Sequence, residues 1–263
     1  MTELDAIRAG DIDVAYRIEG RAGAPVVMMA HGVLADHSIF DAVTRRLVND
    51  YTVLRYDLRG HGRTEATAGP YTMAQLADDA MALLDALHLH GVHYIGTSLG
   101  GMIGQQLGAV GGGRFVSLTL ANTAAVQPNP GAWNDRIATA QRDGVQAVVE
   151  GTLQRWFTPA FFASRPEEVE RIRAVARHTP VAGFIGAAAA VRDLDQLDSL
   201  PRILVPTLVL AGGHDQATPA ALGATIHEGI ANSRFATLDA AHQAVAEVPE
   251  DFCDAWLDFA RNS

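Results

Sequence analysis

The sequence predicts an α/β protein: a mostly parallel sheet flanked by helices, into which a helical segment is inserted. Short β-rich runs alternate with longer stretches of helical periodicity through residues 11–121, and the alternation resumes near residue 206. Between these two parts, residues 125–200 contain no clear buried strand, and five prolines interrupt their helical stretches. Strand–helix alternation is typical of parallel strands joined by right-handed crossovers.

Apolar runs identify the strands of the first part. Residues 11–18 alternate between apolar and other side chains, as a half-buried strand does. Residues 25–30 and 52–56 are nearly continuous apolar runs, which are expected of strands buried on both faces. Two further strands are predicted at residues 92–96 and 115–121.

Helical spacing identifies the segments between the strands. Residues 73–89 have apolar side chains at helical spacing, and Thr72 is a suitable N-cap. Residues 99–110 form a helix of small residues. After residue 206 the same reasoning predicts strands at 207–211 and 234–238, and helices at 219–230 and about 249–260.

The break in this rhythm divides the chain. Residues 1–124 and 201–263 are predicted to form the core, and residues 125–200 a helical cap insertion. The insertion is expected over the carboxyl edge of the sheet, where open α/β folds bind their ligands.

Composition excludes several classes of protein. The formal net charge of −10 disfavours nucleic acid and anionic membranes as partners. Cys253 is the only cysteine, so no intrachain disulfide and no cysteine-based zinc site is expected. No apolar run has membrane-spanning length, and the first residues lack a basic, apolar leader. We therefore expect a cytoplasmic protein, either a monomer or a homo-oligomer.

The motif Gly-Thr-Ser-Leu-Gly at residues 96–100 lies between a predicted strand and a predicted helix. In this context the serine sits on a sharp, strained turn that exposes its hydroxyl. The helix N-terminus and the Leu99 N–H can stabilise an oxyanion beside it. We interpret Ser98 as a nucleophile rather than the cap of an ordinary glycine-rich turn.

A serine nucleophile needs a base, and histidine suits this role because its ordinary pKa lies near neutrality. Of the ten histidines, His242 follows the last predicted strand and therefore lies at the same sheet edge as Ser98. The spacing of His88, His90 and His93 could suggest a metal, but no carboxylate accompanies them, so a solvated loop is preferred. Neither a metal nor a cofactor is predicted.

The acid that orients the histidine is predicted to be Asp215, which follows the strand at 207–211. Asp239 is a rival, but it lies only three residues before His242 and belongs to a strand end. Asp57 is another rival, whose expected role is to hold the turn at 59–62. The chosen residues follow the order Ser, Asp, His, which characterises one large family of hydrolases.

A second oxyanion donor is expected after the strand at 25–30. We assign it to the Val33 N–H, paired with that of Leu99, because Gly32 lets the backbone approach the substrate. His31 is interpreted as a structural hydrogen-bonding residue.

With these residues identified, the chain resembles the α/β-hydrolase superfamily over essentially its whole length, and more narrowly the 3-oxoadipate enol-lactonases. The shared segments are Leu-Arg-Tyr-Asp-Leu-Arg-Gly-His-Gly at 54–62, Gly-Pro-Tyr-Thr at 69–72, Ala-Asn-Thr-Ala-Ala at 121–125 and Arg-Trp-Phe-Thr at 155–158. The resemblance implies an α/β-hydrolase fold with an eight-stranded sheet. It also implies hydrolysis of a small enol-lactone that bears a carboxylate, as in the degradation of aromatic compounds.

Two segments depart from the pattern of that family. His31-Gly32-Val33 stands where the family has a segment containing serine and asparagine, and residues 186–192 also differ. These departures bear on the choice of substrate and leave the catalytic assignment unchanged.

The expected substrate is a small lactone or ester, cleaved through an acyl-enzyme on Ser98. Trp133 and Trp156 are candidates to line the pocket, and Arg136, Arg155 and Arg192 are candidates to pair with a carboxylate, although packing or surface roles are the alternative for each. A generic carboxylesterase and a carbon–carbon bond hydrolase remain alternatives with the same triad. A non-catalytic ligand receptor is the alternative of another class, because fold alone does not determine function.

Overall fold

An eight-stranded, mostly parallel sheet forms the centre of the molecule, as predicted. The computed structural model describes residues 4–111 and 113–262. The strand order is β1-β2-β4-β3-β5-β6-β7-β8, and only the pairs β1–β2 and β2–β4 are antiparallel within the described sheet. The strands are β1 (Asp5–Ala9), β2 (Ile12–Gly20), β3 (Val26–Ala30), β4 (Thr52–Tyr56), β5 (Val92–Thr97), β6 (Phe115–Ala121), β7 (Thr207–Gly212) and β8 (Ser233–Leu238).

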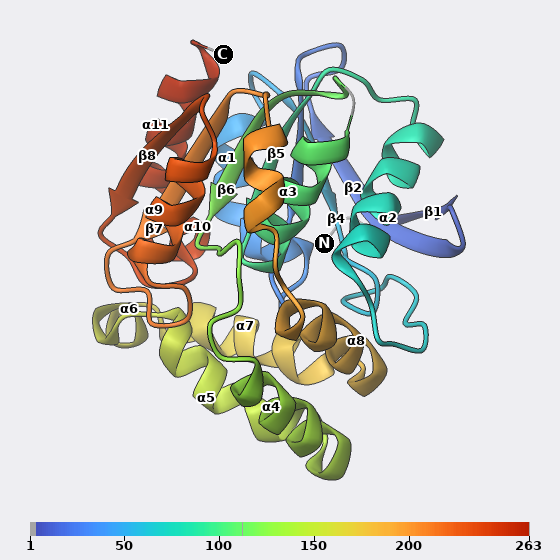
Figure 1. Cartoon of the computed structure of the whole chain (residues 1–263), viewed down its shortest axis with the longest axis vertical. Coiled ribbons are helices and arrows are strands. Elements are labelled where there is room, and N and C mark those ends of the chain that lie inside the picture. The colour runs from blue at the N-terminus through green and yellow to red at the C-terminus, as the bar shows by residue number, and fades with distance from the viewer. Residues whose placement is uncertain (1–3, 112, 263) are drawn as a thin grey trace.

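Helices cover both faces of this sheet (Figure 1). On one face α2 (Met73–Ala86) packs on α3 (Leu99–Val110), and α9 (Ala220–Gly229) packs on β7. On the other face α1 (Asp41–Leu47) packs on α11 (Pro249–Ala260). The central strands β5 and β7 are buried along their whole length, as expected of parallel strands covered by helices on both faces.

Five helices, which we call the cap helices, lie together at one end of the molecule, at the bottom of Figure 1. They are α4 (Pro130–Asp143), α5 (Gln146–Trp156), α6 (Pro159–Ser164), α7 (Pro166–His178) and α8 (Val181–Arg192). Proline occupies the first turn of α4, α6 and α7. Backbone N–H groups in the first turn have no acceptor within the helix, so proline, which has no N–H, costs no hydrogen bond there. Three of the five prolines of residues 125–200 therefore begin helices.

The short elements were missed in the sequence. Strand β1 lies at the edge of the sheet with most of its residues exposed, so it lacks an apolar run. Helix α1 has only 7 residues and helix α10 (Ala244–Glu247) only 4. The 3-10 turns η1 (His37–Phe40) and η2 (Leu197–Arg202) have 4 and 6 residues. Such lengths are too short for a helical period to stand out.

The predicted helix at 73–89 ends earlier than expected. Its N-cap is confirmed, because the Thr72 side chain accepts a hydrogen bond from the Gln75 N–H at 3.1 Å. The helix stops at Ala86 because His88 turns into the left-handed region, with φ of 55°.

Within the described residues, no single helix is long and apolar enough to cross a membrane. Helices α7 and α8 pass that test only as a pair, with a bend of 95° between them. Residues 1–3, on which part of the expectation of no leader rested, lie outside the described residues.

Candidate active site

Ser98 occupies a strained turn between β5 and α3. Its φ of 54° and ψ of −115° lie in a region that residues other than glycine rarely adopt. The turn closes only because its neighbours are glycines. A Cβ on Gly96 would lie 2.2 Å from the Gly100 carbonyl oxygen, and one on Gly100 would lie 2.0 Å from that of Ala30.

Backbone hydrogen bonds hold this turn against two other strands. The Ser98 N–H donates to the Ala121 carbonyl at 2.9 Å, and the Gly100 N–H donates to that of His31 at 3.0 Å. Leu99 is the first residue of α3, so its N–H has no acceptor within the helix. These two hydrogen bonds therefore fix the backbone of the serine turn, while the Leu99 N–H at the N-terminus of α3 stays available beside Ser98.

The backbone near Val33 lies directly against Ser98. A Cβ on Gly32 would lie 3.0 Å from Ser98 Cβ and 3.4 Å from its Oγ, a tight contact that glycine avoids. Val33 and Ser98 line the same cleft.

Asp215 and His242 form a buried pair. The Nδ1 of His242 lies 2.8 Å from Asp215 Oδ2, and the two side chains are 4% and 0% exposed. The Asp215 carboxylate accepts four further hydrogen bonds. Its Oδ1 accepts from the N–H groups of Ala217 and Thr218, and its Oδ2 from Thr218 Oγ1 and Asn122 Nδ2.

This environment keeps Asp215 ionised. Burial raises the pKa of the carboxyl, but the charge of His242 and the hydrogen bonds from His242, Thr218 and Asn122 outweigh it, so the pKa is lowered. Because Nδ1 of His242 faces the carboxylate, Nε2 is the nitrogen left to exchange a proton.

The predicted residues converge on one cleft of about 760 Å³ between the cap helices and the sheet. Ser98, His242, Val33, Trp133 and Trp156 all line it, and Asp215 lies behind His242. The fold thus brings together at one cleft five residues that were predicted from distant parts of the sequence. Their catalytic and binding roles stay predictions at this point.

Arg136 and Arg155 bring positive charge into the cleft, whereas Arg192 does not. No described carboxylate lies within ion-pairing distance of Arg136, whose Nη2 donates to Thr152 Oγ1 at 2.9 Å. Burial, followed by the charge of Arg155, lowers the pKa of Arg136 to about 9, so the guanidinium still carries its charge at neutral pH. Arg192 pairs with Asp193 and is not part of the lining.

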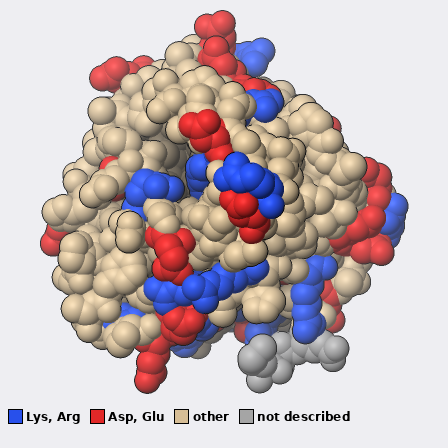
Figure 2. Space-filling view, turned by 90° about the horizontal axis from the view of Figure 1, so that it is seen from below, with Lys and Arg blue, Asp and Glu red and all other residues tan. Residues whose placement is uncertain are grey.

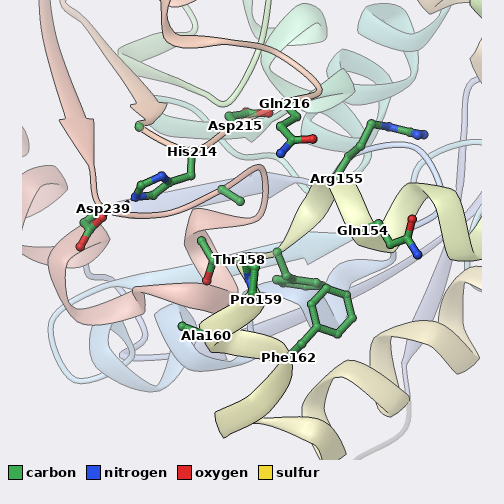
Figure 3. Close-up of a pocket in the computed structure, with 13 residues that line it drawn as sticks. Gln154, Arg155, Thr158, Pro159, Ala160, Phe162, His214, Asp215, Gln216 and Asp239 are labelled. Atoms are coloured by element: carbon green, nitrogen blue, oxygen red, sulfur yellow. Dashed lines mark hydrogen bonds and ion pairs between the residues drawn. The ribbon is translucent and has the colours of Figure 1, made fainter.

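A second groove of about 1110 Å³, which we call the outer groove, adjoins the cleft (Figure 3). It lies between the segment 154–162 and the loop after β7, and its lining shares Arg155 and Gln216 with that of the cleft. In Figure 3 the Arg155 side chain points away from His214 and Asp239, which lie at the far end. Arg155 therefore stands at the junction of the two cavities.

The rival acids have other partners. Asp239 is exposed and lies 2.8 Å from the exposed His214. Asp57 accepts from the Arg63 N–H at 2.9 Å and pairs with His37 at 2.8 Å, so it holds the turn after β4 as expected.

Two histidines near the cleft have structural contacts. His31 is fully buried; its Nδ1 donates to the Gly32 carbonyl and its Nε2 accepts from the Leu58 N–H. His61 packs edge-on against His31, with ring centroids 5.4 Å apart. The interpretation of His31 as a hydrogen-bonding residue agrees with these contacts.

One group of described residues, Asp36, His37 and Asp57, comes close enough together to hold a metal ion. Its members already bind one another and Ser38. His88, His90 and His93 do not form such a group among the described residues.

Two residues that support this site were missed in the sequence. Asn122 belongs to the segment 121–125 shared with the enol-lactonases; it is 1% exposed and contacts Asp215. Its position directly after a strand was the available signal. Thr218 gave no sequence signal at all.

The face of the molecule that carries the cap helices has both basic and acidic side chains (Figure 2). The chain contains no lysine, so the blue atoms of Figure 2 are arginines. They gather around a recess near the middle of this face, with acidic side chains beside them (Figure 2).

Comparisons with known proteins identify the family and the fold of the chain. A family model described as alpha/beta hydrolase fold matches residues 25–248. The 3-oxoadipate enol-lactonase 2 of Acinetobacter baylyi is 32% identical over 248 residues, which cover 94% of this chain and 93% of that protein.

Two solved structures are similar throughout. An enol-lactonase from Burkholderia xenovorans has a TM-score of 0.95 at 33% identity, covering 98% of this chain and 100% of that one. A hydrolase from Pseudomonas aeruginosa has a TM-score of 0.94 at 38% identity, covering 98% of both chains. The resemblance to enol-lactonases is confirmed, and because the family model spans most of the chain, the protein belongs to the family of the alpha/beta hydrolase fold.

Proposed function

We propose that the protein is a serine hydrolase that cleaves a small lactone or ester bearing a carboxylate, through an acyl-enzyme on Ser98. One observation carries the proposal: the strained Ser98 turn and the buried Asp215–His242 pair meet at the same cleft. In this assignment Ser98 is the nucleophile, His242 the base and Asp215 the residue that orients it.

In the first step His242 Nε2 takes the Ser98 proton while Oγ attacks the carbonyl carbon. The oxyanion forms between the Val33 and Leu99 N–H groups, at the N-terminus of α3. When the tetrahedral intermediate collapses, His242 returns the proton to the leaving oxygen. If that oxygen belongs to an enol, the product rearranges to a ketone, which favours acylation.

In the second step His242 activates a water molecule, which attacks the acyl-enzyme. The proton passes to Ser98 and the new carboxylate is released. Asp215 stabilises the transient imidazolium in both steps, since it stays ionised at neutral pH.

Arg136 supports a carboxylated substrate. A partly buried guanidinium without a carboxylate is a costly arrangement unless a ligand supplies the missing charge. The overall charge of −10 makes an unpaired cation in the cleft all the more informative. In this proposal residues 1–124 and 201–263 supply the chemistry, and residues 125–200 recognise the substrate.

The relatives point to the same class. Two relatives from Acinetobacter baylyi, 32% and 29% identical, and the structure from Burkholderia xenovorans are named enol-lactonases. We therefore propose a 3-oxoadipate enol-lactone or a close analogue as the substrate, in a pathway that degrades aromatic compounds.

The mechanism is tested with Ser98→Ala and the control Ser164→Ala, which removes an exposed hydroxyl outside the cleft. Turnover in Ser98→Ala should fall by several orders of magnitude with unchanged melting temperature, because the nucleophile is lost. A fluorophosphonate should label the wild type and Ser164→Ala but not Ser98→Ala. Full activity in Ser98→Ala would contradict the proposal.

The substrate is tested by comparing an enol-lactone with a carboxylate, a neutral nitrophenyl ester and a vinylogous diketone. The proposal expects the highest kcat/KM for the carboxylated lactone. A preference for the neutral ester would indicate a generic carboxylesterase, and a preference for the diketone a carbon–carbon bond hydrolase. Labelling of Ser98 without turnover of any of these would favour a receptor.

A further inference from the structure

The sheet places a strand without a predicted catalytic residue in the middle of the site. Ser98 follows β5, Asp215 follows β7 and His242 follows β8, and the strand order here is β5-β6-β7-β8. Strand β6 therefore lies between the serine and the two partners that must reach it (Figure 1). Its carboxyl end, residues 121–123, meets all three loops.

Towards β5, this segment holds the serine turn. The Ala121 carbonyl accepts from the Ser98 N–H at 2.9 Å, and Thr123 Oγ1 donates to the Ser98 carbonyl at 2.7 Å. Both bonds go to the backbone of Ser98, so they fix its position without touching its hydroxyl.

Towards β7 and β8, the segment acts through Asn122. Its Nδ2 donates one hydrogen bond to Asp215 Oδ2 at 3.1 Å and another to the Ala241 carbonyl at 3.0 Å. Ala241 directly precedes His242. One amide group thus binds both the carboxylate and the loop that carries the imidazole.

The backbone of Asn122 has a left-handed conformation and is held by a hydrogen bond to β7. Its φ of 47° is left-handed, a conformation that asparagine tolerates better than most residues, and its N–H donates to the Leu210 carbonyl at 2.8 Å. The side chain is 1% exposed and does not line the cleft. Asn122 therefore acts on the site only through other residues.

We propose that Asn122 is a positioning residue of the triad: its amide fixes the carboxylate of Asp215 relative to the loop of His242. The inference rests on the proposed function. Asp215 Oδ2 accepts from Asn122 and pairs with His242 at the same time, so the amide shares the negative charge that the imidazole experiences. Without the amide, more of that charge would act on the imidazole and its loop would lose an anchor.

The test uses Asn122→Gly and Asn122→Ala, with Thr123→Val as the matched control. Both Asn122 variants remove the two hydrogen bonds, but only alanine is strained at positive φ. A change that they share therefore reports the lost amide, and a difference between them reports the backbone. Thr123→Val removes the bond to the Ser98 backbone and leaves Asp215 and His242 untouched.

We expect kcat/KM for a nitrophenyl ester to fall about tenfold or more in both Asn122 variants, which is what a hydrogen bond to a charged group is worth. The fall should appear in kcat, with KM nearly unchanged. The acidic limb of the pH profile should move up by roughly 0.5–1 pH unit, because the less shared charge of Asp215 stabilises the protonated imidazole. Thr123→Val should slow the reaction and leave that limb in place.

An unchanged acidic limb in both Asn122 variants would overturn the proposal. So would an equal shift in Thr123→Val, because the limb would then report general loosening of the site. Failure of the proposed function gives a different result, namely full activity of Ser98→Ala. Melting temperatures of all variants identify any loss of rate that comes from unfolding.

Discussion

The guanidinium carbon of Arg136 lies 4.1 Å from the centroid of the Trp133 ring. The two residues are three positions apart on α4, so they share one face of the helix. A cation above an indole is stabilised, but its charge is not neutralised. The pair therefore presents a partly buried positive charge to the cleft, backed by an aromatic surface.

Arg136→Gln should lower kcat/KM for a carboxylated lactone by about 100-fold, because the buried charge pair with the ligand is lost. The effect should lie mainly in KM. A neutral nitrophenyl ester should be cleaved at nearly the wild-type rate, since it offers no partner to the guanidinium. Steady-state kinetics on both substrates measure this selectivity.

Arg192→Gln is the control for this change, because Arg192 pairs with Asp193 outside the cleft. It removes the same charge and should leave both substrates unaffected. Equal losses on the carboxylated and neutral substrates in Arg136→Gln would mean that Arg136 supports the cleft rather than the ligand.

Arg155 should influence how fast anionic ligands reach the cleft. It lies at the junction with the outer groove (Figure 3). Burial lowers the pKa of Arg155, and no described carboxylate pairs with it. Arg155→Gln should reduce kcat/KM for the carboxylated lactone several-fold at low salt. The difference from wild type should shrink as salt is added, because steering by a half-exposed charge is screened.

Arg165→Gln is the matched control, since Arg165 is an exposed arginine of the cap helices outside both cavities. Its salt dependence should equal that of the wild type. If Arg155→Gln behaves in the same way, Arg155 does not guide the ligand.

The glycines of the serine turn give a prediction that combines strain and stability. Gly96→Ala would place a Cβ 2.2 Å from the Gly100 carbonyl, and backbone atoms cannot yield cheaply. We expect a loss of about 3 kcal/mol or more in the free energy of unfolding, together with loss of activity. Gly131→Ala, whose Cβ would meet only ordinary contacts in the first turn of α4, should be neutral or slightly stabilising. Urea unfolding of both variants tests the contrast.

The parts of the fold that could be predicted are those whose pattern is local. Buried strands such as β6 and small-residue helices such as α3 show their period directly, and both were predicted with the bounds that the structure has. Strand β1 could not be found in this way, because an exposed edge strand has no apolar run.

The site residues likewise fall into those that a local pattern predicts and those whose role depends on tertiary contacts. Ser98, Asp215 and His242 were predicted because each lies within four residues of the carboxyl end of a strand, and the carboxyl ends of parallel strands share one edge. The choice among Arg136, Arg155 and Arg192 depends on which side chain lacks a carboxylate, which is a tertiary property. The role of Asn122 likewise depends on contacts with loops 93 and 119 residues away in the chain.

His61 predicts how the stability of the protein depends on pH. Burial, and then the nearby His31, lower its pKa to about 3. In the unfolded chain a histidine has its ordinary pKa of about 6.5. Below about pH 6.5 the His61 ring is therefore protonated in the unfolded state but stays neutral in the folded state. The free energy of unfolding consequently decreases as the pH falls from about 6.5 towards 3.

His61→Asn removes this titration and can keep a donor for the Arg59 carbonyl, which the ring contacts through Nδ1 at 3.1 Å. Between pH 6 and 4 the unfolding free energy of the wild type should fall more steeply than that of the variant, by about 1.4 kcal/mol per pH unit. Urea unfolding at several pH values gives both slopes. His178→Asn, at an exposed histidine, should keep the wild-type slope, whereas parallel slopes for wild type and His61→Asn would show that the folded state accepts the proton.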